Sequence, residues 1–297
     1  MGLHRSGTTF LYECLSKVLP VAKTTIQHAV FYPQLISSYH TDKGLSDGAT
    51  LEAYFQHNHA SQRGNDNIEL NSNTAEEYGW VLREQAGSFV VGTKTAGTLK
   101  DLVQKISYMN PECKAILLKN PWDITSAEYI AKTFPQAKFI FIHRNPLEIL
   151  NSEISNLLYF SRSEDPLLFL LTRNIPEKRI LFAIIRFIRL VTTEKLFLKL
   201  MTRALAADIA SNLQHYEHSL QELPAQSIIE TSYADLVDNT PATLTKICDF
   251  LQLKTISNVE SLQGKRRNAK ILPCVAEHSS KMQARLKSLG LSRFFGA

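Results

Sequence analysis

This sequence has no apolar stretch long enough to cross a membrane as a helix. The longest candidate, residues 180–191, is interrupted by Arg186 and Arg189 and falls short of the roughly 18 residues that a span needs. Its pattern predicts an amphipathic helix. The sequence also has no N-x-S/T acceptor for N-glycosylation, so nothing in it is typical of a secreted glycoprotein.

Cysteine is scarce, and no metal-binding spacing occurs. The four cysteines include no C-x-x-C pair, which argues against a zinc ribbon or a redox motif and indicates reduced thiols. The pairs His57-x-His59 and His215-x-x-His218 each have no third ligand nearby, so solvated helices explain them better. We expect a cytoplasmic protein that uses no metal.

The sequence also has no large excess of either positive or negative charge. The 33 Lys and Arg against 28 Asp and Glu leave a net charge of +5, which suits small anionic ligands better than nucleic acid. Apolar residues make up 44% and charged residues 21% of the 297 residues, as in ordinary globular proteins. We expect one α/β domain over residues 1–297, with its oligomeric state left open.

Short apolar strands alternate with helices in the middle of the chain. Such alternation is typical of a buried parallel sheet. The predicted strands are 89–91, 115–118, 139–142 and 227–230, and the helices between them are 99–108, 125–134 and 146–159.

Two other regions lie outside this alternation and are expected to help form a binding site. Residues 23–80 are polar and irregular, with a helical patch at 51–59, and predict a lid or an acceptor-binding insertion. Residues 166–223 are helical in pattern throughout. Further helices are predicted at 8–18, 240–251 and 277–289.

A glycine-rich turn opens the chain. Residues 2–9, G-L-H-R-S-G-T-T, fit the frame G-x-x-x-x-G-x-[ST] and lead into a helix, whose N-terminal N–H groups can bind an anion. The lysine of a nucleoside triphosphatase loop is replaced by Thr8, and the positive charge comes from Arg5 instead. Alone, this turn could equally be a simple helix start.

Two more strands end in cations. Arg144 follows the strand at 139–142, and Ser152 comes eight residues later on the next helix, which together predict a second anion pocket. A strand that holds magnesium would end in Asp. Lys119 follows the strand at 115–118; it is either a solvated strand end or a third cation at the same sheet edge.

Together these motifs resemble the sulfotransferases that use 3'-phosphoadenosine 5'-phosphosulfate (PAPS). R-S-G-T-T at residues 5–9 is similar to their 5'-phosphosulfate loop, and Arg144 with Ser152 to their 3'-phosphate motif. Lys119-Asn120-Pro121 resembles their K-[ST]-P, and Tyr233 begins a segment similar to their Y-E-D-L. The likeness is greatest to the carbohydrate, tyrosyl-protein and bacterial branch.

The resemblance implies a fold and a set of site residues. The fold would be a P-loop-like three-layer α/β/α with a mostly parallel central sheet and a helical acceptor-side region. PAPS would be the co-substrate, without a metal. The residues expected to bind it are Arg5, Ser6, Gly7, Thr8, Thr9, Arg144, Ser152, Tyr233, Arg266 and Arg267, although the basic run at 265–267 could equally be solvated.

The resemblance also implies catalytic roles. Arg5 and Lys119 would stabilise the leaving group, and His28 is the candidate base, with a structural or surface role as the alternative. Two departures are evident: Ala234 replaces the acidic residue of Y-E-D-L, and Pro121 stands where cytosolic relatives carry a catalytic histidine.

The predicted function is transfer of a sulfuryl group from PAPS to a hydroxyl or amine of a small-molecule, carbohydrate or peptide acceptor. The alternatives are a pseudoenzyme that only binds the nucleotide and, with less support, a P-loop nucleotide kinase. Relatives run an apolar strand into the loop, so we expect such a strand upstream of Met1 or another segment in its place.

Overall fold

The computed structural model describes residues 1–41, 43–64, 68–162, 164–264 and 270–295. The chain divides into two compact units. The first unit comprises Met1–Pro20, Pro121–Leu157 and Ile188–Ala297, and the second comprises Val21–Asn120 and Leu158–Phe187. Two helices, α8 (Pro146–Arg162) and α10 (Pro176–Val191), each contain residues of both units.

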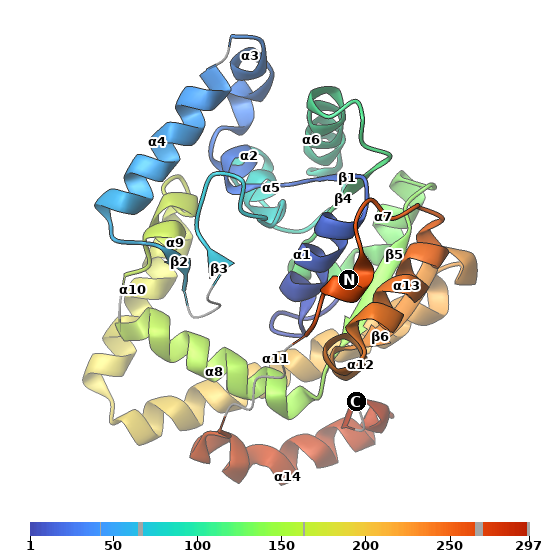
Figure 1. Cartoon of the computed structure of the whole chain (residues 1–297). Helices are drawn as coiled ribbons and strands as arrows, with labels where there is room; N and C mark the ends of the chain where they lie inside the picture. Colours follow the sequence, from blue (N-terminus) through green and yellow to red (C-terminus); the bar gives the residue numbers. More distant parts are fainter. Residues whose placement is uncertain (42, 65–67, 163, 265–269, 296–297) are drawn as a thin grey trace. The chain divides into compact units, whose positions relative to one another are not determined.

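The first unit is built on a pair of parallel strands, β5 (Phe139–His143) and β6 (Ile228–Ser232). They pair in register from Phe139 opposite Ile228 to His143 opposite Ser232, and Figure 1 shows them side by side. The continuous apolar run F-I-F-I produces β5 because it is covered on both faces, and Phe141 and Ile142 are fully buried.

Helices surround this strand pair. Helix α11 packs against α7, α14 and the 3-10 turn η2, while α12 packs against α13 and β6. The elements are α1 (Thr8–Val18), η2 (Pro121–Thr125), α7 (Ala127–Thr133), α11 (Glu194–Glu222), η3 (Ala225–Ser227), α12 (Tyr233–Asp238), α13 (Thr240–Leu251), η4 (Val259–Ser261), α14 (Pro273–Ser288) and η5 (Ser292–Phe295).

Met1 lies alongside β5. The Ile142 N–H donates to the Met1 carbonyl at 2.9 Å, and the Met1 amino group donates to the Ile140 carbonyl. Because β6 pairs with one edge of β5, these bonds occupy the other edge. The residue just before the glycine-rich loop therefore already holds a strand-like position, while the strand expected upstream stays a prediction.

The second unit contains a further parallel pair, β1 (Val21–Lys23) with β4 (Ala115–Leu117), and a short antiparallel pair, β2 (Gln62–Arg63) with β3 (Ile68–Glu69). Helix α6 packs on β1 and β4 through its buried Leu99, Leu102 and Ile106. The helices are α2 (Ile26–Val30), η1 (Tyr32–Gln34), α3 (Leu35–His40), α4 (Lys43–His57), α5 (Gly79–Ala86), α6 (Ala96–Met109) and α9 (Pro166–Leu171).

The mixed α/β class and the parallel pairing are confirmed, and two predicted helices, Thr8–Val18 and Thr240–Leu251, have the predicted bounds. The strand predicted at 89–91 is wrong. The Ser88 hydroxyl accepts from the Val90 N–H at 3.1 Å, and the Thr95 hydroxyl donates to the Val90 carbonyl at 2.9 Å. Side chains therefore satisfy the backbone groups that a strand would offer to a neighbour.

Candidate functional site

The glycine-rich loop folds as a tight turn before α1. Gly7 caps the helix with φ of +101°, in the left-handed region, and a Cβ there would lie 2.4 Å from Cδ2 of Tyr233. Ser6 is fully buried, and its hydroxyl donates to the Leu3 carbonyl at 2.7 Å. The loop thus ends at the positive end of α1, where the first N–H groups have no acceptor within the helix.

Arg5 and Ser152, which the sequence assigns to two different anion motifs, are in contact. The Arg5 Nε donates to the Ser152 Oγ at 2.9 Å, and Arg5 itself has a positive φ of 64°. The Arg144 Nη1 donates to the Arg5 carbonyl at 3.2 Å. The loop, the end of β5 and the second turn of α8 therefore meet at one place in the first unit.

Tyr233 joins this group. It begins α12 directly after β6, and its ring lies 4.2 Å from the Arg144 guanidinium carbon while also contacting Gly7. Glu148 accepts from the Arg144 Nε at 2.8 Å. Stacking and hydrogen bonds hold the guanidinium plane in one orientation, as recognition of a phosphate requires.

The basic run that contains Arg266 and Arg267 lies outside the described residues. The described residues on either side of the run are held by hydrogen bonds to α13 and α8. The Gly264 N–H donates to the Thr240 hydroxyl at 2.8 Å, and the Leu272 N–H donates to Oδ1 of Asn151, the neighbour of Ser152, at 2.8 Å.

Lys119 lies in the second unit, two residues beyond β4. It is buried, and its Nζ pairs with Oε1 of Glu77 at 3.1 Å. The neighbouring Glu76 carboxylate pairs with Arg63 at 3.4 Å, and burial raises the pKa of Glu76. Lys119 is thus part of a buried cluster of alternating charges rather than a solvated strand end.

His28 also lies in the second unit, where it caps α2. Its Nδ1 accepts from the Thr25 N–H at 3.2 Å, and the Thr25 hydroxyl accepts from the His28 N–H at 3.3 Å, which completes a capping box. The ring also hydrogen-bonds the Lys23 backbone, and burial lowers the pKa of His28 to about 4. The ring is therefore neutral at neutral pH.

Comparison with known proteins agrees with the motifs. The profile of the sulfotransferase family matches residues 1–166, more than half of the chain. The chain belongs to the sulfotransferase family. Among curated proteins, no sequence matches this chain.

Two solved structures have a fold similar to that of this sulfotransferase. Sulfotransferase STF9 from Mycobacterium avium superimposes with a TM-score of 0.66 at 13% identity, over 97% of this chain and 74% of that chain. Sulfotransferase STF1 from Mycobacterium tuberculosis gives a TM-score of 0.59 at 16% identity, over 97% of this chain and 75% of that chain. At these identities the likeness is one of fold.

Sequence reasoning missed Glu153, the neighbour of Ser152 on α8. Its Oε2 is buried and, within the described residues, has no hydrogen-bond partner. Burial, and then the charge of Asp208, raise the pKa of Glu153 to about 8, while Arg5 opposes this shift. The carboxyl group is therefore largely protonated, and so uncharged, at pH 7. A glutamate in an amphipathic helix carries no signal of such burial.

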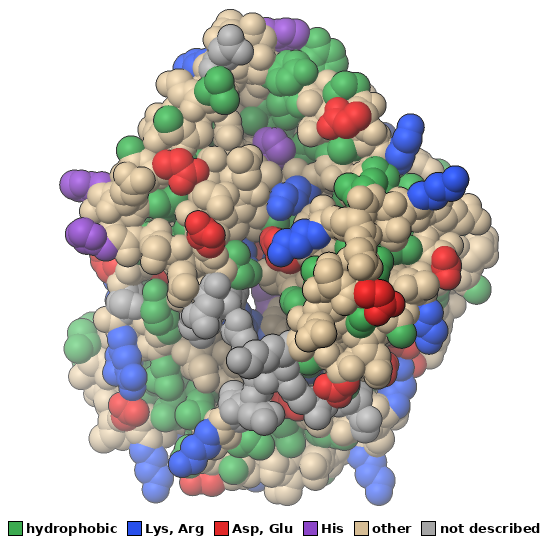
Figure 2. Space-filling model, in the orientation of Figure 1, with side chains coloured by type: hydrophobic (Ala, Val, Ile, Leu, Met, Phe, Trp, Pro, Cys, Tyr) green, Lys and Arg blue, Asp and Glu red, His purple; other side chains and the backbone are tan. Residues whose placement is uncertain are grey.

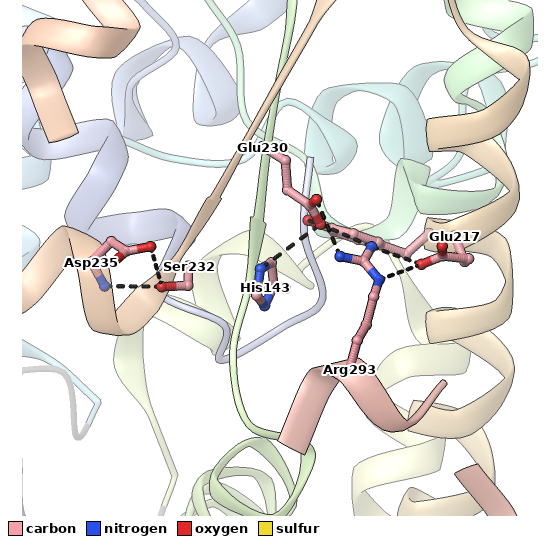
Figure 3. A network of polar contacts seen from close by, with 7 residues as sticks. His143, Glu217, Glu230, Ser232, Asp235 and Arg293 are labelled. Carbon is pink, nitrogen blue, oxygen red and sulfur yellow. Dashed lines mark hydrogen bonds and ion pairs between the residues drawn. The ribbon is translucent and has the colours of Figure 1, made fainter. Parts of the chain in front are cut away.

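A second missed feature of the sulfotransferase supports the strand ends that carry Arg144 and Tyr233 (Figure 3). Arg293 of η5 pairs with Glu217 at 2.7 Å and with Glu230 at 3.0 Å, and Glu230 faces His143. The Ser232 hydroxyl accepts from the Asp235 N–H at 2.9 Å and so caps α12. This network ties the last turn of the described chain to the ends of β5 and β6.

The described residues also bear on metal binding and on membrane crossing. Within the described residues, no group of three or more His, Cys, Asp or Glu side chains is placed to hold a metal ion. None of the helices in the described part of the chain combines the length and the apolar character needed to cross a bilayer.

Proposed function

We propose that this sulfotransferase transfers the sulfuryl group of PAPS to a hydroxyl or amine of a small-molecule, carbohydrate or peptide acceptor by in-line displacement. The observation that carries the proposal is the convergence of Arg5, Ser152 and Arg144, with Tyr233 stacked on Arg144. Two guanidinium groups, a hydroxyl and a helix N-terminus form a donor set that matches phosphate esters.

Each part of the donor has proposed partners. The loop residues Ser6, Gly7, Thr8 and Thr9 would hold the 5'-phosphosulfate with backbone N–H groups at the start of α1. Arg144 and Ser152 would hold the 3'-phosphate, beside Tyr233. Arg266 and Arg267 are proposed to close over the 3'-phosphate or the adenosine, and the anchored flanks at Gly264 and Leu272 support this position.

Catalysis requires positive charge at the leaving oxygen and a base for the acceptor proton. Arg5 and Lys119 would supply the charge. Lys119 would do so as a buried ammonium whose orientation is set by Glu77. His28 is the proposed base because its ring is neutral at neutral pH, although it must first release its hydrogen bond to Thr25.

The proposal extends to the fold. The parallel pairs β1–β4 and β5–β6 support a P-loop-like three-layer arrangement in which cations follow the carboxyl ends of the strands. Residues 23–80 and 166–223 are proposed to shape the acceptor side, as parts of a single domain.

The test is binding of adenosine 3',5'-bisphosphate measured by calorimetry. Arg144→Ala should weaken binding by about 100-fold or more, because a charge-assisted and stacked contact to a phosphate is lost. Arg285→Ala, at an exposed position of α14, is the matched control and should leave binding unchanged. Equal affinities of the two variants would overturn the assignment of the 3'-phosphate site.

Two observations favour a second candidate, a nucleotide-binding pseudoenzyme. His28 already serves as a cap with its ring nitrogens engaged, and Ala234 replaces the acidic residue of the family motif. Transfer of radiolabelled sulfate to pooled acceptors separates the two: bisphosphate binding without transfer would support the pseudoenzyme.

A further inference from the structure

A buried cluster of four charged side chains lies within the second unit. The Lys119 Nζ pairs with Oε1 of Glu77 at 3.1 Å, and the Arg63 Nη1 pairs with Oε2 of Glu76 at 3.4 Å. Only 7% of the Lys119 side chain and 5% of the Glu76 side chain are exposed. We call these four residues the Lys119 cluster, in which two cations balance two carboxylates.

Backbone hydrogen bonds hold both glutamates against the ends of two paired strands. The Glu76 N–H donates to the Thr24 carbonyl at 3.0 Å, and the Tyr78 N–H donates to the Lys119 carbonyl at 3.4 Å. Thr24 directly follows β1, Lys119 follows β4 by two residues, and these two strands are parallel. The two glutamates therefore lie at the carboxyl ends of β1 and β4.

The two ion pairs of the Lys119 cluster act on one another. The Glu76 Oε1 accepts from the Glu77 N–H at 2.9 Å, so the position of one carboxylate helps to fix the backbone of the other. Burial raises the pKa of Glu76, and the charge of Arg63 opposes this rise more strongly than the charge of Lys119 does. An unbroken series of contacts thus links the Arg63 guanidinium to the Lys119 ammonium.

Stability alone does not account for this cluster. Apolar side chains that replace a buried ion pair often leave stability unchanged or raise it, because each buried charge has lost its hydration. A buried lysine that lacks a carboxylate partner releases its proton more readily, and its flexible four-carbon stem lets the ammonium change direction. The Glu77 carboxylate therefore secures both the charge and the direction of Lys119.

We propose that Glu77 is a positioning residue for sulfuryl transfer, which keeps Lys119 charged and holds its ammonium in one direction. Arg63 and Glu76 are positioning residues one step further away, because they hold Glu77 in place. These roles rest on the one proposed for Lys119 at the leaving oxygen and require no contact with the reacting atoms. Since Arg63 lies on β2, within the region 23–80 proposed to shape the acceptor side, the cluster joins that region to Lys119.

The first test separates turnover from nucleotide affinity. Glu77→Gln should lower kcat for sulfate transfer at least about tenfold, whereas calorimetry should show a far smaller change in the affinity for adenosine 3',5'-bisphosphate. Glu77→Asp, which keeps the charge, should recover part of the loss, and Arg63→Lys should lose less than Arg63→Gln. Glu112→Gln, at an exposed position of the same unit, is the matched control and should leave kcat unchanged. An unchanged kcat in Glu77→Gln would overturn the proposal.

A double-mutant cycle tests whether Glu77 acts through Lys119. The double variant Lys119→Ala, Glu77→Gln should have a kcat no lower than that of Lys119→Ala, because Glu77 then has no ammonium to position. Arg63→Gln should likewise cause no further loss once Lys119 is alanine. Losses in kcat that multiply in the double variants would show independent roles and overturn the proposal.

NMR of the lysine side chains gives a readout that needs no turnover. The Nζ resonance of Lys119 is identified by its loss in Lys119→Arg. In a pH titration Lys119 should release its proton at a lower pH in Glu77→Gln than in the unchanged protein or in Glu112→Gln, by at least about one pH unit. Identical titrations would overturn the proposal whether or not sulfate is transferred. Absence of both bisphosphate binding and transfer in the unchanged protein would instead contradict the proposed function, so the two failures are distinguishable.

Discussion

Gly7 is a residue whose conformation and surroundings both exclude a side chain. Its φ of +101° suits glycine, and the Tyr233 ring occupies the place of a Cβ. We expect Gly7→Ala to lower the free energy of unfolding by about 1–3 kcal/mol and to weaken binding of adenosine 3',5'-bisphosphate, because Tyr233 must move away from Arg144.

Denaturant unfolding and calorimetry measure the two effects. Gly97→Ala is the matched control, since Gly97 lies in α6 with open space around its Cβ position. That substitution should be neutral or stabilise the protein by up to about 1 kcal/mol. Similar behaviour of the two variants would contradict this account of the loop.

His28 is expected to make the stability of the folded protein depend on pH. Its folded-state pKa of about 4 lies below the unfolded value near 6.5, so the unfolded chain binds more protons between these values. Stability should therefore fall as the pH decreases from about 6.5 to 4, by on the order of 1.4 kcal/mol for each unit of pKa shift. Thermal melts at pH 7 and pH 5 should show a smaller loss in His28→Gln, because glutamine can complete the capping box without a titrating ring.

The same variant tests the proposed base. If His28 accepts the acceptor proton, His28→Gln should lower kcat by about 100-fold or more while its melting temperature at neutral pH stays close to that of the unchanged protein. An unchanged kcat would leave His28 with the capping role alone.

At the scale of elements, η5 secures the ends of β5 and β6. Phe294 is fully buried, with its ring centre 5.5 Å from that of His143 and 5.6 Å from that of Tyr216. Phe294→Ala should cost about 3–5 kcal/mol, since it leaves a cavity beside the strand that carries Arg144. Chemical denaturation measures the loss. Phe187→Ala, at an exposed site of α10, should change stability by less than about 1 kcal/mol, and a small effect of Phe294→Ala would contradict the bracing role.

Elements were predictable where local pattern and tertiary burial agree. Helix α13 begins at Thr240 before a proline and has apolar residues on one face, so its bounds follow from local chemistry. The segment at 89–91 is apolar like a strand, yet Ser88 and Thr95 capture its backbone groups. Here side chains compete with a neighbouring strand for the backbone N–H and carbonyl groups. Hydropathy does not show which of the two partners lies within hydrogen-bond distance.

At the scale of the whole molecule, the chain forms two compact units whose residues alternate along the sequence. The chain passes from one unit to the other several times, so unfolding of one unit would strain the connections of the other. We expect a single transition in differential scanning calorimetry, with equal calorimetric and van't Hoff enthalpies. Two separate transitions would indicate independent units and contradict the prediction of a single domain.

The distribution of positive charge over the chain is less even than its net charge alone suggests. Figure 2 shows, over the described part of one face, Lys and Arg side chains spread singly or in twos among other side chains. The segment at 173–203 nevertheless has a net charge of +6, against +5 for the whole chain. Net charge is a sum over the molecule, whereas attraction to a charged surface depends on where the charges lie.

The sequence by itself determined the glycine-rich and strand-end motifs, the mixed α/β class with parallel strands, and the family. These depend on local order: a glycine turn before a helix, a cation after an apolar strand, and a serine two helical turns beyond Arg144. Only the tertiary structure decided which groups meet. It joined Arg5 to Ser152, stacked Tyr233 on Arg144, paired Lys119 with Glu77, made His28 a cap and buried Glu153. The reason is physical, because burial and hydrogen-bond partners depend on segments far apart in the chain, which sequence spacing does not record.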